Sequence, residues 1–128
     1  MASTTDRSVL LVDDDRDFLI VLQDLLPFHL GRLNIDTATS GTEALALIQR
    51  NHYDAIISDV RMPGMDGLDL LKRALKEQPK TPFLLMTAHG DSHLGHEAME
   101  LGAYAYLEKP IDRQYFLDCV RRALASPN

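Results

Sequence analysis

Five short runs of apolar residues recur along the chain, and each is followed by a segment with a helical pattern. The first run, Val9–Val12, is apolar on both alternating faces, which is typical of a strand covered on both sides in a parallel sheet. The pattern predicts an alternation of buried strands and surface helices. The predicted strands are Val9–Val12, Ile35–Ala38, Tyr53–Asp59, Phe83–Thr87 and Ala103–Leu107.

After each run, apolar residues return every three or four positions, which predicts five helices with one apolar face. Ser40 and Glu43 have the spacing of a capping box. Pro27 interrupts the first helical pattern, so we expect that helix to end or bend near Leu26. The other predicted amino-terminal caps are Asp15, Asp66, Asp91 and Asp112. The predicted apolar face of the last helix consists of Tyr115, Phe116, Cys119, Val120 and Leu124.

Strands that alternate with helices predict right-handed crossovers, a parallel sheet and helices on both of its faces. In such an α/β fold the carboxyl ends of all strands lie at one edge, where open sheets place their chemistry. Polar side chains follow or end four of the predicted strands, so we expect them to converge on one rim. They are Asp13, Asp14, Asp59, Thr87 and Lys109.

Length and charge narrow the class of protein. A chain of 128 residues suits one domain, and we expect an ordered core over about residues 8–125 with loose tails at Met1–Arg7 and Ser126–Asn128. A net charge of −6 argues against direct nucleic-acid binding. The single cysteine, Cys119, suits a reducing compartment, and no apolar run is long enough to span a membrane. We therefore expect a cytoplasmic protein.

The predicted rim has the composition of a metal and phosphoryl site. Several carboxylates in one place repel one another unless a cation lies among them, and oxygen ligands favour Mg²⁺, or Mn²⁺ in its place. A carboxylate beside such an ion is suited to accept a phosphoryl group. Asp59 is the best candidate because a proline- and glycine-rich loop follows it at once. Lys109 offers a positive charge for a phosphoryl oxygen.

In order and spacing these motifs resemble the receiver domain of two-component response regulators, from about residue 9 to residue 124. The resemblance implies a flavodoxin-like fold, which is a doubly wound five-stranded parallel sheet of order 2-1-3-4-5 with five helices. The matching motifs are the pair Asp13-Asp14, Asp59 in Asp-Val-Arg-Met-Pro-Gly-Met-Asp-Gly, Thr87 in Met-Thr-Ala, and Lys109 in Glu-Lys-Pro.

The resemblance also implies roles for these residues. Asp59 would take a phosphoryl group from a phosphohistidine of a sensor histidine kinase or phosphotransfer protein. Lys109 would pair with the resulting aspartyl phosphate, and the hydroxyl of Thr87 would move to hydrogen-bond to it. The implied ligands of Mg²⁺ are Asp13, Asp14, Asp59 and the backbone carbonyl of Arg61.

Tyr106 lies at the family's switch position, and the resemblance implies that it swings inward as Thr87 moves. The face of the fourth helix, fifth strand and fifth helix would then repack and signal to an output domain, a downstream protein or a second copy in a phosphorylation-dependent homodimer. The bond Lys109–Pro110 is implied to be cis. Ser126–Asn128 resembles the start of a linker, which favours an excised domain over a single-domain regulator or a phosphorelay shuttle.

Two more side chains are implied to tune the loss of the phosphoryl group. Arg61 and His89 lie two residues after Asp59 and Thr87, at positions that border the attacking water in the family. Both side chains can donate hydrogen bonds. The sequence leaves open whether they orient this water or block it.

Three other functions stay open at this point. A Mg²⁺-dependent phosphohydrolase with an aspartate nucleophile usually has an acid where this chain has Arg61. A flavin-binding domain of the same topology would have to hold a phosphate beside carboxylates without a metal. A degenerate receiver that acts only as a protein-interaction module would not need the complete set of rim residues. We therefore predict a signalling phosphoacceptor that assists its own phosphorylation and dephosphorylation, and not a turnover enzyme.

Overall fold

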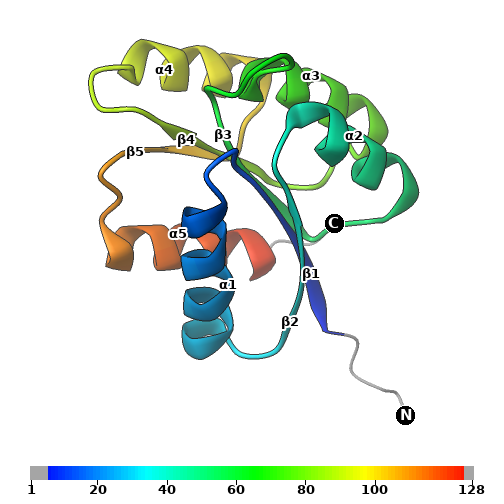
Figure 1. Ribbon diagram of the computed structural model, residues 1–128, viewed down its shortest axis with the longest axis vertical. Coiled ribbons are helices and arrows are strands. Elements are labelled where there is room, and N and C mark those ends of the chain that lie inside the picture. The colour runs from blue at the N-terminus through cyan, green and yellow to red at the C-terminus, as the bar shows by residue number, and fades with distance from the viewer. Residues whose placement is uncertain (1–5, 126–128) are drawn as a thin grey trace.

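The computed structural model describes residues 6–125 and shows a parallel sheet between two layers of helices (Figure 1). The strands are β1 (Arg7–Val12), β2 (Leu33–Ala38), β3 (Ala55–Asp59), β4 (Phe83–Thr87) and β5 (Ala105–Glu108). The helices are α1 (Arg16–Leu30), α2 (Gly41–Arg50), α3 (Gly67–Glu77), α4 (Ser92–Leu101) and α5 (Arg113–Ala125). The strand order is β2-β1-β3-β4-β5, which confirms the predicted flavodoxin-like fold.

Each face of the sheet carries its own apolar core. Helices α2, α3 and α4 cover one face, and α1 and α5 cover the other (Figure 1). The side chains of β1 divide between the two cores: Leu10 and Val12 pack under α2 and α3, whereas Val9 and Leu11 pack under α1 and α5. All four are fully buried, as expected for the continuous apolar run of a strand covered on both faces.

The helix starts mostly follow the predicted caps. Asp15 and Asp66 each accept a hydrogen bond from the N–H three residues ahead, at 3.2 and 2.9 Å. Ser40 accepts one from the N–H of Glu43 at 3.1 Å. The carboxylate of Glu43 accepts from the N–H of Thr39 at 2.8 Å, one residue before the cap. The capping box is therefore present in a form shifted by one residue.

Two predictions about helix residues are wrong. Asp91 lies at the amino-terminal cap position of α4, but its side chain makes no capping hydrogen bond: its ψ of 30° is not the extended value of a capping residue, and its carboxylate accepts from an arginine. Tyr115 is 54 % exposed, because Phe116 and Cys119 fill the inward face of α5 beside it. Asp112 caps α5 as predicted and accepts from the N–H of Tyr115 at 3.1 Å.

Some element boundaries also differ from the prediction. Tyr53 precedes β3, and its hydroxyl donates to Asp36 at 2.6 Å. Strand β5 begins two residues after Ala103, and β1 begins at Arg7, inside the predicted loose tail. The other predicted tail, Ser126–Asn128, lies outside the described residues. Within residues 6–125 no helix has the length and apolar character needed to cross a membrane.

Helix α1 runs through Pro27 to Leu30, contrary to the predicted end near Leu26. Pro27 has no N–H for the carbonyl of Gln23, but Gln23 lies on the exposed side of α1, where water can bond to that carbonyl. Leu26 is fully buried, and Leu30 packs against the same core. We infer that this packing outweighs the lost hydrogen bond, so that α1 ends only at Leu30, with Gly31 as its carboxyl-terminal cap.

Replacing Pro27 with alanine should stabilise the protein by about 1 kcal/mol, because it restores an N–H in the last turns of α1 and improves helix propensity. Urea unfolding measures the change. Pro79→Ala is the matched control, since Pro79 lies in a turn outside any helix, and it should change the free energy of unfolding by less than about 0.5 kcal/mol. A loss of stability in Pro27→Ala would contradict the proposed balance.

Candidate functional site

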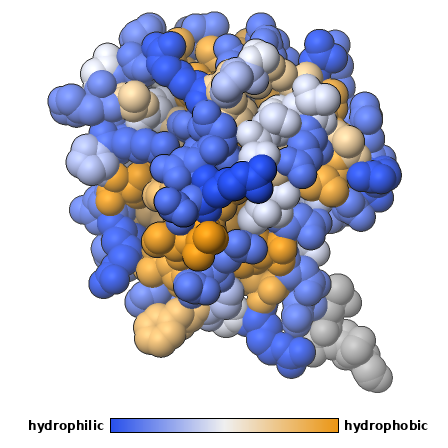
Figure 2. Space-filling view, viewed as in Figure 1, coloured by the Kyte–Doolittle hydropathy of each residue, from blue (hydrophilic) through white to orange (hydrophobic). Residues whose placement is uncertain are grey.

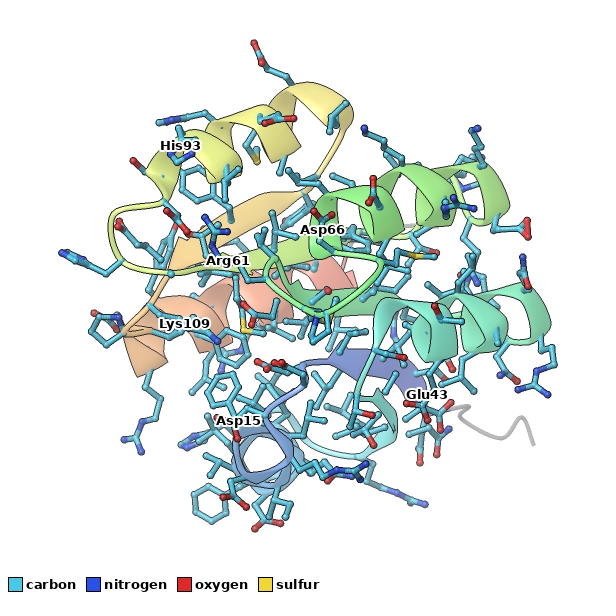
Figure 3. The ribbon with its side chains drawn as sticks, turned by 45° about the horizontal axis from the view of Figure 1, so that its top comes forward. Asp15, Glu43, Arg61, Asp66, His93 and Lys109 are labelled. Carbon is cyan, nitrogen blue, oxygen red and sulfur yellow. The ribbon has the colours of Figure 1, made fainter. Side chains whose placement is uncertain are left out.

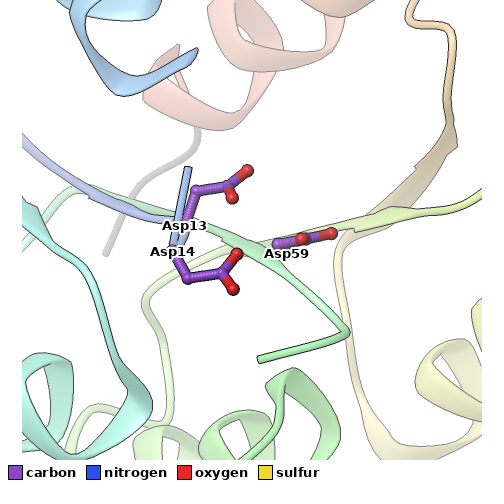
Figure 4. Close-up of side chains that lie close together, drawn as sticks. All are labelled: Asp13, Asp14 and Asp59. Carbon is purple, nitrogen blue, oxygen red and sulfur yellow. The ribbon is translucent and has the colours of Figure 1, made fainter. Parts of the chain in front are cut away.

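Three carboxylates meet where the neighbouring strands β1 and β3 end (Figure 4). Asp13 and Asp14 follow β1, Asp59 ends β3, and one oxygen of each lies within 4.8 Å of the other two. Backbone groups fix the inner pair: the N–H of Asp15 donates to Asp13 at 3.0 Å, and that of Val60 donates to Asp59 at 3.1 Å. Over residues 6–125 this is the one such group of potential metal ligands.

Burial makes the two inner carboxyl groups reluctant to ionise. Asp13 is 1 % exposed, and the side chain of Asp59 is 13 % exposed. Desolvation raises the pKa of both groups above 3.8, and the charge of Asp13 raises the pKa of Asp59 further. Nearby backbone N–H groups and Lys109 act in the opposite direction without cancelling the rise. The pair is therefore destabilising in its ionised form when no further cation is present.

Lys109 lies directly after β5 (Figure 3), and its side chain reaches the acidic cluster. Its Nζ lies 3.4 Å from Asp13 Oδ2 and 3.5 Å from Asp59 Oδ1, and 5.0 Å above the ring of Phe18. Its backbone N–H donates to the carbonyl of Thr87 at 2.7 Å, and Lys109–Pro110 is cis as expected. The structure thus brings the predicted lysine to the predicted carboxylates.

Thr87 ends β4 beside the acidic cluster. Met86, one residue earlier, pairs in register with Asp59 of β3. Thr87 is fully buried, and its Oγ1 has no hydrogen-bond partner among the described residues. A buried hydroxyl without a partner costs about 1–3 kcal/mol. Thr87 is therefore a donor that a new acceptor at this rim would satisfy.

Tyr106 of β5 packs against α4. Its hydroxyl lies 3.1 Å from Nε2 of His96, and the two rings meet edge to face at 5.3 Å between centroids. Gly95 lies under the ring: a Cβ at this position would collide with the ring atoms of Tyr106. Gly95 and His96 thus form the packing site of the Tyr106 ring on α4, which we call its seat. The sequence did not predict this site, because the contact depends on how α4 lies on β5.

The side chains of Arg61 and His89 point to other partners. Arg61 Nε donates to Asp91 Oδ2 at 2.8 Å, although the two residues are 30 positions apart. The side chain of His89 is 87 % exposed, with Nδ1 3.7 Å from Glu108 Oε2. The structure therefore leaves both residues on the loops around Asp59 without joining their side chains to it. No sequence motif signals the contact between Arg61 and Asp91.

The loop after Asp59 folds back tightly because of a glycine. The N–H of Gly67, the first residue of α3, donates to the carbonyl of Val60 at 2.7 Å. A Cβ at Gly67 would collide with the backbone carbonyl oxygen of Asp59. Only glycine lets α3 begin this close to the backbone of Asp59. The residue lies in the motif that follows Asp59, but its function in packing is visible only in the fold.

The donor set fits a magnesium ion. Carboxylate oxygens are the ligands that Mg²⁺ prefers, and a cation among them would relieve the repulsion that raises the pKa of Asp59. Asp13, Asp14 and Asp59 would hold the ion, which would supply positive charge for the oxygens of a transferred phosphoryl group.

Comparison with known proteins agrees with this geometry. The sequence profile described as "Response regulator receiver domain" matches residues 9–121. The chain belongs to this family. Receiver domains are signalling phosphoacceptors that bind Mg²⁺ at an acidic pocket, which corresponds to the cluster of Asp13, Asp14 and Asp59.

The amino-acid sequence of this receiver domain is similar to parts of longer regulators. It is 40 % identical to the C4-dicarboxylate transport transcriptional regulatory protein DctD of Rhizobium meliloti, over 91 % of this chain and 25 % of DctD. It is 43 % identical to the transcriptional regulatory protein FixJ of Bradyrhizobium diazoefficiens, over 85 % of this chain and 52 % of FixJ. The chain therefore spans between a quarter and about half of the length of these curated relatives.

Solved structures give the same result for the fold. A putative response regulator from Chloroflexus aurantiacus superposes with a TM-score of 0.86 at 35 % identity, covering 95 % of this chain and all of that one. The signal receiver domain of an HD domain-containing protein from Pseudomonas fluorescens superposes with a TM-score of 0.85 at 36 % identity, covering 94 % and 95 % of the two chains.

The raised pKa of Asp59 predicts that Asp59→Asn stabilises the metal-free protein. A carboxyl group whose pKa is raised by folding loses its stabilising contribution as pH rises through the folded pKa. At pH 7 the variant should therefore be more stable than the native protein by about 1 kcal/mol, and the difference should shrink towards pH 4. Urea unfolding at several pH values measures it.

Asp17→Asn is the matched control, since Asp17 lies exposed in the first turn of α1 outside the cluster. It should show no such pH-dependent gain. Saturating Mg²⁺ should increase the free energy of unfolding of the native protein more than that of the Asp59→Asn variant. An Asp59→Asn variant that is less stable than the native protein at every pH would refute the assignment of repulsion at this site.

Proposed function

We propose that the domain, spanning residues 1–128, accepts a phosphoryl group on Asp59 from a phosphohistidine of a sensor histidine kinase or phosphotransfer protein. The observation that carries the proposal is the cluster of Asp13, Asp14 and Asp59 beside Lys109 at the carboxyl end of the sheet. Asp59 is the central member, because β3 lies between β1 and β4 in the sheet. Asp13 and Asp14 are therefore on one side of it, and the hydroxyl of Thr87 is on the other.

The transfer needs an oriented carboxylate and positive charge around it. An oxygen of Asp59 attacks phosphorus, and the bond between phosphorus and the histidine nitrogen of the donor breaks as the new oxygen–phosphorus bond forms. The N–H of Val60 orients the carboxylate, and Lys109 places an ammonium group beside it. The three acids and the backbone carbonyl of Arg61 would hold Mg²⁺, which would supply the remaining charge for the phosphoryl oxygens.

Thr87 and Tyr106 respond to the phosphoryl group on Asp59. An aspartyl phosphate adds roughly one to two negative charges and new acceptor oxygens at the rim. The unpartnered hydroxyl of Thr87 gains an acceptor there, which favours an arrangement in which Thr87 moves towards Asp59. Tyr106 then leaves its seat on α4 and turns inward, so that the face formed by α4, β5 and α5 repacks.

The helix α1 side of the molecule supplies a surface for the phosphohistidine partner. Apolar side chains gather over α1 and α5 in the lower half of the space-filling view (Figure 2). They line a groove of about 150 Å³ that includes Phe18, Val21, Leu25, Ile111 and Phe116. Because Lys109 stands 5.0 Å from the ring of Phe18, a helix docked in this groove would carry its histidine close to the acidic cluster.

The α4-β5-α5 face serves the output. It exposes Met99, Tyr104 and Tyr115, which suit contact with an output domain, a downstream protein or a second phosphorylated copy. The domain itself makes no direct contact with nucleic acid in this proposal, in keeping with a net charge of −6. The buried free thiol of Cys119 suits the reducing cytoplasm.

The domain assists its own phosphorylation and dephosphorylation but turns over no substrate of its own. Arg61 and His89 stand on the two loops that flank Asp59, where they tune the approach of water to the phosphoryl group. Replacing either should change the lifetime of the phosphate more than the affinity for Mg²⁺.

Acetyl phosphate with Mg²⁺ should modify the native protein once, and Asp59→Asn should abolish the modification. Intact-protein mass spectrometry counts the added groups, and omitting Mg²⁺ or adding a chelator should suppress them. Asp17→Asn, an exposed aspartate outside the cluster, should be modified as the native protein is. Undiminished modification of Asp59→Asn would refute Asp59 as the acceptor.

Gly95→Ala should weaken the seat of Tyr106, because the new Cβ would collide with its ring. The rearranged face would then be more populated without phosphorylation, and the affinity for beryllofluoride with Mg²⁺ should rise about tenfold if the seat contributes about 1.4 kcal/mol. NMR titration measures the affinity and the environment of Tyr106. Glu97→Ala, an exposed change on the same helix, should leave both unaltered. An unchanged affinity in Gly95→Ala would refute the seat as a brake on the switch.

A further inference from the structure

The ion pair of Arg61 and Asp91 joins the two loops that flank Asp59. Arg61 is on the loop after β3, and Asp91 is the residue before α4. Nε of Arg61 donates to Oδ2 of Asp91 at 2.8 Å, and the two side chains are 66 % and 19 % exposed. The hydrogen bond and charge of Arg61 lower the pKa of Asp91. The carboxylate of Asp91 is thus ionised and bound to Arg61. In Figure 3 the two loops can be found by the labels of Arg61 and of His93 at the start of α4.

The carboxylate of Asp91 does not cap α4, although residues at this position cap the other helices. Asp15, Ser40 and Asp66 occupy the cap positions of α1, α2 and α3, and each accepts a backbone N–H from the first turn. Asp91 occupies the cap position of α4 and accepts none. The first N–H groups of α4 therefore lack the side-chain acceptor that the other three helices have, and the N–H of Leu94 donates to the backbone carbonyl of Asp91 instead, at 2.9 Å.

We propose that Asp91 is a positioning residue for which Arg61 and the start of α4 compete. The proposal rests on the proposed function of Asp59. With Asp59 unmodified, Asp91 directs the guanidinium towards α4 and leaves this helix uncapped. A phosphoryl group on Asp59 attracts Arg61, and the released carboxylate of Asp91 then accepts N–H groups of the first turn of α4.

Charge favours this exchange. The hydrogen bond and charge of Asp91 raise the pKa of Arg61, and the charge of Asp59 adds to this rise, so the guanidinium lies within the field of Asp59. A phosphoryl group increases that negative charge and offers oxygens that a planar guanidinium can bind in pairs. Asp91 stands directly before α4 with a ψ of 30°, and a rotation of ψ towards the extended range of Asp15 and Asp66 would carry its carboxylate to the first turn.

The consequence is a link between the acceptor site and the stability of α4 that does not pass through Thr87 and Tyr106. A helix that gains its cap frays less at its first turn. Helix α4 contributes to the face that is expected to contact the output, and Gly95 and His96 of this helix also carry the seat of Tyr106. Arg61 thus acts on the output face through Asp91.

The first test uses the protein without metal or phosphoryl analogue. Arg61→Gln releases Asp91, so hydrogen exchange over the first turns of α4 should slow by about fivefold. Arg61→Lys keeps a positive charge and should restore much of the native exchange rate. Asp91→Ala in the Arg61→Gln background removes the cap and should abolish the slowing. Unchanged exchange in Arg61→Gln, or slowing that persists without Asp91, would overturn the proposal.

The second test uses Mg²⁺ and beryllofluoride as the probe of the phosphorylated arrangement. Asp91→Asn can still cap α4 but no longer forms the ion pair, so it should bind the probe about two- to fivefold more tightly. Adding Arg61→Gln to Asp91→Asn should remove this gain. Equal affinities for the native protein and Asp91→Asn, or a gain that survives without Arg61, would overturn the exchange. Failure of the native protein to bind the probe would instead count against the proposed function of Asp59, and the metal-free exchange test would still decide the competition for Asp91.

Discussion

Repulsion between carboxylates that the fold holds together is the constraint on which the functional end of this molecule depends. Asp13 and Asp59 cannot separate, because backbone N–H groups of their own loops fix their oxygens. They cannot be solvated either, since both are largely buried. The free energy lost in this arrangement is recovered when positive charge enters the cluster. The sheet thus holds a site that favours a divalent cation and the chemistry that follows from it.

Residues around the cluster connect its charge to neighbouring strand ends. Lys109 balances part of the repulsion and is tied by its backbone to the carbonyl of Thr87. Thr87 carries a buried hydroxyl with no partner, so it responds to any acceptor that appears beside it. Among these rim residues Thr87 is therefore the one whose bonding is incomplete, since Asp13, Asp59 and Lys109 already have partners. In the proposed function, this incomplete bonding would allow a change of one or two charges to shift a folded arrangement.

Glycines set the distances over which these effects act. Gly67 allows α3 to begin directly against the carbonyl of Asp59, and Gly95 allows the ring of Tyr106 to lie on α4. Close contacts of this kind leave little room for gradual movement, because protein interiors are densely packed. In the proposed switch, the side chains at this edge would therefore move between separate positions. The exchange proposed for Asp91 has the same character, since one carboxylate can serve an arginine or a helix end.

The sequence by itself determined which segments form strands and which residues lie at the rim, whereas the order of the strands followed from the resemblance to receiver domains. Continuous apolar runs can only be buried on both faces, and parallel strands must bring their carboxyl ends together, so Asp13, Asp59 and Lys109 were predictable before the fold was known. Caps at Asp15 and Ser40 were predictable too, because such contacts span only a few residues.

Contacts between elements were decided by the tertiary structure alone. Pro27 stays within α1 because Leu26 and Leu30 bury against the sheet, and local propensity carries no information about that packing. Asp91 serves Arg61 instead of α4 because two loops 30 residues apart meet at the rim. Tyr106 finds His96 for the same reason. Short-range patterns fix which elements form, whereas the partner of each polar side chain at the site depends on how those elements pack against one another.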